Sequence, residues 1–230
     1  MLIGTNLFMM LGKLKYFIVL ILDWLYLKSY DFYIFGKNKF SNGKSYKELF
    51  NEINQKSYDA IEKLEIEMNH SIDKKWIDDL ALITQIVKKK SELNYSHGKA
   101  LYCVLSNYLQ KKINQNLKEN LTILETGTAR GFSAICMSKA LIDKKINGKI
   151  ITIDVISHNK EIYWNCIKDE TGPKKRSELL ENWKHELENI IFLQGRSSVV
   201  LKMIGVNRIN FAFLDGQHDE QTIVNEFNFV

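Results

Sequence analysis

Proline is almost absent from this chain of 230 residues, and Pro173 is the only one. A proline-rich linker or hinge is therefore excluded, and no internal repeat or low-complexity tract divides the sequence. With 45% hydrophobic and 26% charged residues, the composition is that of an ordinary globular protein. The length allows one well-packed α/β domain together with an additional helical portion.

Arginine is scarce as well. The net charge of +5 comes almost entirely from lysine, and the lysines are scattered along the chain rather than gathered in stripes. Proteins that read nucleic acids usually place arginine forks on guanine edges and phosphates. We therefore expect no nucleic-acid partner, and we interpret the lysines as a solvated surface.

Cysteine occurs only as Cys103, Cys136 and Cys166, which are odd in number and form no C-x-x-C pair. This spacing excludes a disulfide framework and a zinc cluster. Each cysteine stands among apolar residues, where the side chain usually acts as a small buried hydrophobe. The pattern predicts a reducing compartment, and hence a cytoplasmic location.

Long hydrophobic runs are also lacking. The longest near the N-terminus extends from Tyr16 to Leu22 and ends at Asp23, whereas a membrane-spanning helix needs about 20 apolar residues. No small-residue cleavage site follows it. Aromatic residues beside lysines are typical of a membrane interface. Burial against the domain or a partner and peripheral membrane contact through residues 8–35 both stay open, and a true span is least favoured.

The sequence divides into three regions. Residues 1–44 combine the apolar and aromatic N-terminal segment with a polar linker after Gly36. Residues 45–118 carry apolar side chains at helical spacing and predict a helical cap region. Its third helix is expected from about Gly98 to Leu117, with Ser96 and His97 as candidate caps. In residues 119–230 the apolar side chains recur with a different period.

In that last region four short apolar runs, LTILET, KIITID, NIIFLQ and INFAFLD, alternate with helix-like segments. The helices are expected at residues 133–142, 174–187, 197–204 and 219–230. Strands that alternate with helices predict right-handed βαβ units and a parallel sheet buried on both faces. The fold class is therefore α/β, a Rossmann-like, doubly wound and mainly parallel sheet with a helical N-terminal region.

The turn after the first run has the pattern E-x-G-x-x-x-G, formed by Glu125, Gly127 and Gly131. It is neither a P-loop nor the G-x-G-x-x-G of dinucleotide sites, which disfavours a nicotinamide-dependent oxidoreductase. Glycines let the backbone approach a ligand closely. A carboxylate opposes a diphosphate but suits the ammonium group of S-adenosylmethionine. Tight packing of the turn is an equally open interpretation of the loop taken alone.

The ends of the second and third apolar runs also favour a ligand at this edge of the predicted sheet. Asp154 ends the second run, 23 residues after Gly131, where a carboxylate can accept two ribose hydroxyls. The third run leads into Gly195, Arg196 and Ser197, at the rim where an adenine ring would lie. Ser197 can equally be the N-cap of the next helix.

Four motifs taken together resemble a class I S-adenosylmethionine-dependent methyltransferase. They are ILETGTARGFSA, KIITIDV, FLQG and FAFLDGQH. They are most similar to the branch whose fourth strand ends in D-G-x-H, which contains O-methyltransferases of small molecules and sugars. The resemblance covers roughly residues 95–230. It implies that S-adenosylmethionine is held by Glu125, Gly127, Thr128 and Gly131 at the methionine part, Asp154 at the ribose, and Gly195 and Ser197 near the adenine.

The same resemblance places Asp215 and His218 beside the methyl acceptor. His218 is a candidate base, since an imidazole is largely neutral at pH 7. Asp215 is expected to orient it or to hold a divalent cation such as Mg²⁺. Asp215 as a turn residue, and His218 with Asp219 as helix caps, are the structural alternatives.

The predicted function is S-adenosylmethionine-dependent O-methylation of a small-molecule or sugar hydroxyl. The family's sheet has three more strands than this sequence supplies, so we expect a fragment, a homo-oligomer paired through the open edge, or a degenerate copy. The alternative hypothesis is a non-catalytic, truncated methyltransferase-like interaction protein that docks through its aromatic N-terminus.

Overall fold

The structure is a computed structural model that describes residues 14–15, 17–22, 24–25, 36–116, 119–217 and 219–230. The chain divides into two compact units, residues 1–35 and residues 36–230. The described residues of the first unit are helical and expose apolar side chains such as Phe17 and Trp24. The rest of the predicted membrane-contact segment lies outside the described residues. In the described part of the chain, no helix is both long and apolar enough to cross a bilayer.

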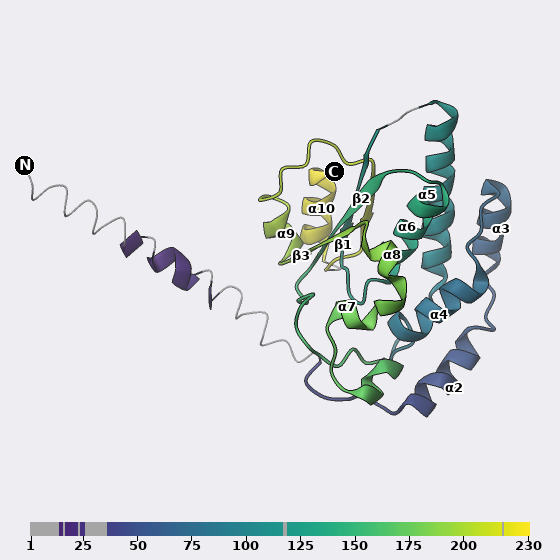
Figure 1. Cartoon of the computed structure of the whole chain (residues 1–230), viewed down its shortest axis with the longest axis horizontal. Helices are drawn as coiled ribbons and strands as arrows, with labels where there is room; N and C mark the ends of the chain where they lie inside the picture. Colours follow the sequence, from purple (N-terminus) through teal and green to yellow (C-terminus); the bar gives the residue numbers. More distant parts are fainter. Residues whose placement is uncertain (1–13, 16, 23, 26–35, 117–118, 218) are drawn as a thin grey trace, which may run out of the picture. The chain divides into compact units, whose positions relative to one another are not determined.

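The second unit is built on a sheet of four parallel strands in the order β3-β2-β1-β4 (Figure 1). The strands are β1 (Leu121–Thr126), β2 (Gly148–Asp154), β3 (Ile190–Gln194) and β4 (Phe211–Leu214). Each coincides with one of the apolar runs, so the predicted α/β class and parallel sheet are confirmed. Among the described residues β4 pairs only with β1, which leaves its outer edge open.

The helices that connect the strands are more interrupted than the apolar periodicity of the sequence predicts. α6 (Phe132–Asp143) and α10 (Glu220–Phe229) are confirmed as single helices. The segment expected as one helix over residues 174–187 instead forms three short pieces, and only the first turn of the segment expected over residues 197–204 is an α-helix. The three pieces are α7 (Arg176–Leu179), η3 (Glu181–Trp183) and α8 (Lys184–Leu187), and the single turn is α9 (Ser197–Val200). A further short helix, η2 (Ile167–Thr171), precedes them.

The second crossover breaks at Leu180. Leu180 leaves the helical conformation at φ −99°, ψ 19°, while Leu179, Leu180 and Trp183 are all buried. These three positions would lie on one face of a continuous helix, so the apolar spacing does not record the break.

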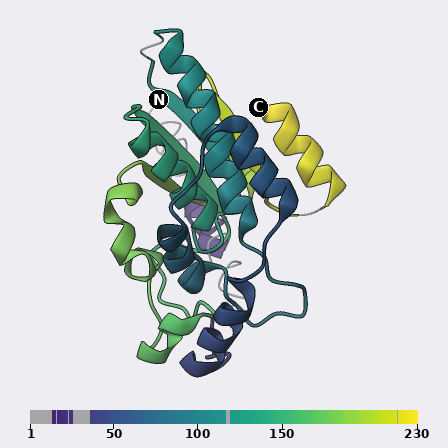
Figure 2. The ribbon, with the colours of Figure 1, turned by 90° about the vertical axis from the view of Figure 1, so that its right-hand side faces the viewer.

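The helical region before the sheet contains α2 (Gly43–Ile53), α3 (Asp59–Met68), α4 (Lys74–Thr84) and α5 (Ser96–Asn114). α5 packs against both α3 and α6 (Figure 2). The predicted capping role of Ser96 and His97 is wrong, because both lie in the first turn of α5 and Tyr95 occupies the N-cap position. Asn94 accepts a hydrogen bond from the Ser96 N–H at 2.6 Å instead. This region lies in the same compact unit as the sheet, and the boundary at residues 118/119 stays a prediction.

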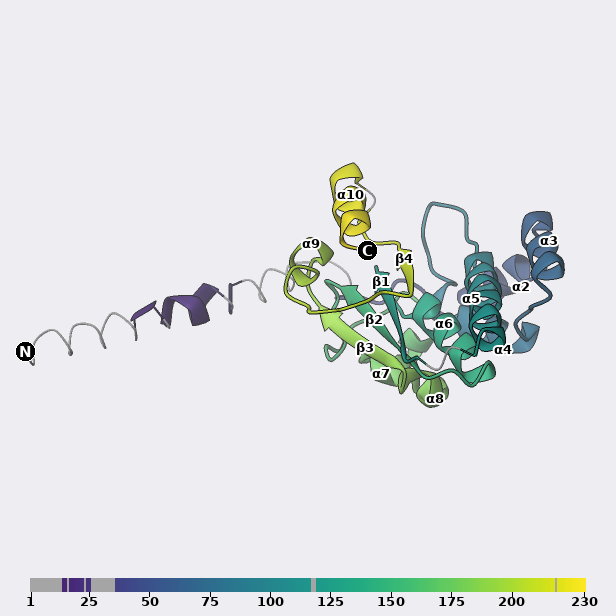
Figure 3. The ribbon, with the colours of Figure 1, turned by 90° about the horizontal axis from the view of Figure 1, so that it is seen from above.

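Helices cover both faces of the sheet, with α6 on one side and α10 on the other (Figure 3). Ile123 and Ile150 belong to the larger core, which continues through α6 into the helical region. Leu124 and Ile153 face the opposite side and pack with Leu201. The alternation follows from the two-residue period of a strand. All three cysteines are free and buried, as predicted.

Candidate active site

Three acids follow one face of the sheet to its carboxyl edge. Glu125 on β1 is in register with Thr152 on β2 and with Phe213 on β4. Asp154 and Asp215 stand two residues beyond those partners and therefore continue the same face. The sheet thus brings Glu125, Asp154 and Asp215 to a shared edge, as the strand-end pattern predicts.

Glu125 is fully buried beneath this edge. One carboxylate oxygen accepts a hydrogen bond from the hydroxyl of Ser133 on α6, and the other accepts from the hydroxyl of Thr152. The Thr128 and Thr152 hydroxyls lie 2.5 Å apart, which extends the network into the loop after β1. Sequence reasoning missed Ser133 and Thr152 because a serine or threonine beside a strand end carries no distinctive signal.

Burial raises the pKa of Glu125 to about 7. The charges of Asp154 and Asp215 act in the same direction, whereas the hydrogen bonds from Ser133 and Thr152 oppose the change. The carboxyl group therefore titrates close to neutral pH, and its burial limits direct contact with any ligand in this conformation.

The turn between β1 and α6 depends on its two glycines. Gly127 has φ +86°, and a Cβ atom there would lie 2.0 Å from the carbonyl oxygen of Asp215. Gly131 has φ +93° and forms the N-cap of α6. Close packing of the β1 loop against the β4 loop therefore explains Gly127, and ligand contact by either glycine stays a prediction.

Asp154 joins two loops at the edge. Its carboxylate accepts hydrogen bonds from the backbone N–H of Ala129 at 2.6 Å and from that of Ile156 at 2.7 Å. Each oxygen keeps a further lone pair. Gly195 adds to the same junction, since its N–H donates to the carbonyl of Asp154 at 2.8 Å.

Ser197 follows β3 at the same edge and is the first residue of α9, where Arg196 occupies the N-cap position and no side chain caps the helix. The interpretation of Ser197 as an N-cap is therefore wrong, and adenine contact stays a prediction.

Asp215 is exposed directly after β4, and its N–H donates to the carbonyl of Thr126 at 3.0 Å. His218 lies outside the described residues. Asp219 is the N-cap of α10, because its carboxylate accepts from the N–H of Thr222 at 2.9 Å. The capping interpretation is thus confirmed for Asp219.

Residues 124–230 match the family model of a methyltransferase domain. This match begins within β1 and includes every strand-end acid described above. Residues 124–230 belong to this methyltransferase family. No curated protein sequence matches the chain.

Several solved structures resemble the chain at low sequence identity. An O-methyltransferase from Bacillus cereus in complex with SAH is 14% identical with a TM-score of 0.41, over 77% of this chain and 62% of that one. The O-methyltransferase TomG from Streptomyces achromogenes, in complex with SAM, is 15% identical with a TM-score of 0.44, over 69% and 62%. The O-methyltransferase NovP is 13% identical with a TM-score of 0.45, over 68% and 77%. The chain spans 62% of the length of the first three structures it matches.

His97 reaches the edge of the methyltransferase domain from α5, outside the matched residues. Its ring contacts that of Phe132 edge-on, with centroids 4.9 Å apart. Burial lowers the pKa of His97, the charge of Asp215 raises it, and that of Lys89 lowers it. The imidazole is therefore neutral at pH 7. The sequence offered only the weak clue that His97 precedes the first strand.

Arg176 is a buried cation behind the loops of the methyltransferase domain. Its guanidinium donates to the carbonyls of Ala129 at 3.0 Å and Ile156 at 3.2 Å, the two residues whose N–H groups bind Asp154. The Trp164 and Phe192 rings lie 5.3 and 5.5 Å away. Burial lowers the pKa of Arg176 to about 10, against the charges of Asp154 and Glu125. Arg176 thus supports the ends of both loops.

A divalent cation has weaker support. Within the described ranges, no three His, Cys, Asp or Glu side chains are placed to hold a metal ion together. Asp215 is the single residue predicted as a metal ligand. The Mg²⁺ assignment stays a prediction, and no chemical step is derived from it.

Proposed function

We propose that the chain binds S-adenosylmethionine at the carboxyl edge and methylates a hydroxyl group of a small molecule or sugar. The observation that carries the proposal is the geometry of Asp154 at this edge of a methyltransferase domain. Two backbone N–H groups fix its carboxylate, and the lone pairs left over suit the paired hydroxyls of a ribose.

The residues around Asp154 also suit the other parts of S-adenosylmethionine, the methyl donor. The β1–α6 turn exposes Ala129 beside Gly127 and Gly131, neither of which carries a Cβ atom. The buried charge of Glu125 lies beneath that turn and favours a cationic group above it. Glu125 acts through this field rather than by contact, since its side chain is fully buried and hydrogen-bonded to the hydroxyls of Ser133 and Thr152.

S-adenosylmethionine, when bound, supplies a methyl group on a positively charged sulfur. Asp154 and the β1–α6 turn would hold the donor so that its methyl group could pass to the acceptor oxygen, with the carbon–sulfur electron pair left on sulfur. The protein contributes alignment, worth about 7–11 kcal/mol in well-oriented cases, and takes up the acceptor's proton. His97, neutral through burial, and His218 are the candidate bases.

A thermal-shift titration tests donor binding. Adenosylhomocysteine at 100 times its dissociation constant should stabilise the fold by about 2.7 kcal/mol, whereas NAD should have no effect. Asp154→Ala should abolish the response. Asp79→Ala is the matched control, because Asp79 is an exposed α4 residue paired with Lys75. A response to NAD alone, or one that survives in Asp154→Ala, contradicts the proposed site, and no response to either ligand favours the non-catalytic alternative.

A further inference from the structure

The first unit exposes a dense group of apolar side chains between residues 14 and 25, purple in Figure 1. Nine large apolar residues in this short segment are 42–60% exposed. They are Leu14, Phe17, Ile18, Val19, Leu20, Ile21, Leu22, Trp24 and Leu25. In the described part of the second unit, ten such side chains are spread over residues 40–230. Single exposed apolar residues are normal, whereas a group this dense marks an interaction surface.

Helical geometry gathers most of these side chains on one broad face. All described residues from 14 to 25 are helical, and each residue of an α-helix turns by about 100°. At that angle, eight of the nine apolar side chains fall within an arc of about 200°. Of the described residues, only Lys15 and Val19 lie outside it. A helix that packs on one protein surface buries a stripe of about 100°, so one flat partner would leave about half of this face in water.

The length of the segment determines how it can meet a bilayer. As a helix, residues 14–25 extend for about 18 Å, whereas the hydrocarbon core of a bilayer is about 30 Å thick. Lys13 and Lys15 precede the apolar run, and Asp23 interrupts it. The segment is therefore suited to lie along the interface, where a helix sinks its apolar face about 5–10 Å below the headgroups.

The residues around the apolar run are also typical of a membrane interface. Trp24 is exposed, and Tyr26, Tyr30 and Tyr33 follow it in the sequence. Tryptophan and tyrosine are enriched at the level of the headgroups because one end of each ring is apolar and the other is polar. Residues 8–35 carry three lysines and two aspartates, a net charge of +1. Attraction to anionic lipids is therefore a minor contribution.

We propose that residues 14–25 attach the protein to the surface of a lipid bilayer. The broad apolar face lies at the boundary of the acyl chains, and Lys15 points toward the headgroups. Acyl chains can surround a half-sunken helix on three sides, which accounts for an apolar arc wider than one protein surface covers. The attachment is separate from the carboxyl edge of the sheet and does not depend on methyl transfer.

Flotation of the full chain with vesicles in a density gradient tests this attachment, since aggregated protein sinks while protein bound to lipid rises. The probes are vesicles of phosphatidylcholine alone and vesicles of equal parts phosphatidylcholine and phosphatidylglycerol. The protein should float with both, with affinities that differ by less than about tenfold, and sodium chloride should not release it. Release by salt would assign binding to the scattered lysines and overturn the proposal.

Matched variants test whether the apolar face carries the binding. Ile21→Asp places a charge at the centre of the arc and should weaken vesicle binding about tenfold or more. Val19→Asp changes an equally apolar residue outside the arc and should bind within about threefold of the parent. Ile66→Asp, at an exposed α3 position of the second unit, should bind as the parent does.

The competing occupants of this face give different results. If a second copy of the chain covers it, the parent should form a dimer without lipid that Ile21→Asp dissociates, and the parent should not float. If the second unit covers it, the parent should stay monomeric and should not float. Either result, or equal flotation of Ile21→Asp and Ile66→Asp, would overturn the proposal.

Discussion

Glu125 at the carboxyl edge of the sheet and Tyr58 in the helical region are both polar groups buried inside the protein, but only Glu125 has hydrogen-bond partners there. Ser133 and Thr152 bind both oxygens of Glu125, whereas the Tyr58 hydroxyl binds nothing in the described chain. The edge of the sheet is therefore organised before any ligand arrives. The helical region instead holds one buried hydroxyl that has no hydrogen-bond partner in the described chain.

Gly127→Ala makes the largest expected change at the organised edge. The new Cβ would overlap the carbonyl of Asp215, and φ +86° disfavours any side chain. Strain and overlap together should lower the free energy of unfolding by about 3 kcal/mol. Gly205→Ala is the control, since its Cβ meets nothing within 4 Å and its φ is not left-handed. Urea denaturation measures both variants, and equal losses would contradict the close approach.

Glu125→Gln tests the cost of the buried carboxylate. Its folded pKa of about 7 exceeds the ordinary value of 4.5, so between these values the folded state binds more protons than the unfolded state. The free energy of unfolding therefore falls as pH rises through this window, by about 3 kcal/mol at 1.36 kcal/mol per pH unit. Denaturation between pH 4 and 8 should show this fall in the parent and a flatter profile in the variant. Parallel profiles would contradict a raised pKa.

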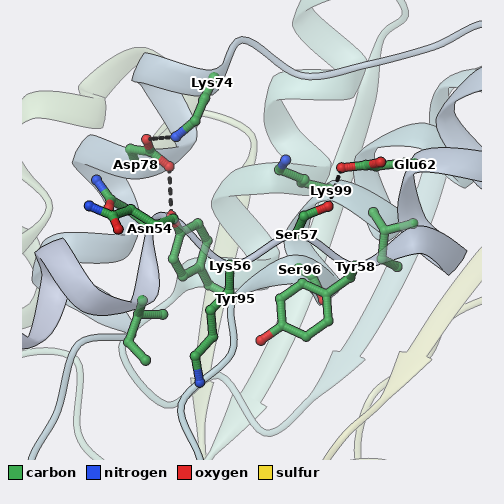
Figure 4. A pocket seen from close by; sticks show the side chains of 13 residues that line it. Asn54, Lys56, Ser57, Tyr58, Glu62, Lys74, Asp78, Tyr95, Ser96 and Lys99 are labelled. Carbon is green, nitrogen blue, oxygen red and sulfur yellow. Dashed lines mark hydrogen bonds and ion pairs between the residues drawn. The ribbon is translucent and has the colours of Figure 1, made fainter.

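Tyr95→Phe and Tyr58→Phe compare a hydroxyl that has a hydrogen-bond partner with one that has none, both in the helical region (Figure 4). Removal of the Tyr95 hydroxyl breaks its bond to Asp78 and should cost about 1.5 kcal/mol. Removal of the Tyr58 hydroxyl breaks no bond within the described chain and should change stability by less than about 0.5 kcal/mol. Urea denaturation decides between them. An equal loss in both variants would show that Tyr58 has a partner.

His97 offers the smallest and most local test. Burial keeps its pKa below the ordinary 6.5, Asp215 raises that pKa and Lys89 lowers it. In an NMR titration Asp215→Asn should therefore move the His97 midpoint further down, whereas Lys89→Met should move it up. An unchanged midpoint in both variants would separate His97 from the edge of the sheet.

Much of the edge was predictable because strand periodicity and strand ends are local features. Glu125, Asp154 and Asp215 each end an apolar run, and parallel strands bring such ends together. The break at Leu180 was not predictable, since Leu179, Leu180 and Trp183 recur at the spacing of one face of a continuous helix. The partners of Glu125 were missed because Ser133 and Thr152 are ordinary polar residues until α6 and β2 lie beside β1.

The sequence alone determined the α/β class, the parallel strands, the buried thiols and the acids at one edge, because apolar period and turn chemistry act over a few residues. Only the tertiary structure decided that Glu125 is sealed beneath the edge, that His97 reaches it from another region, and that the Tyr58 hydroxyl is buried without a partner in the described chain. Burial and unsatisfied donors depend on which distant segments pack together, and no local pattern records that.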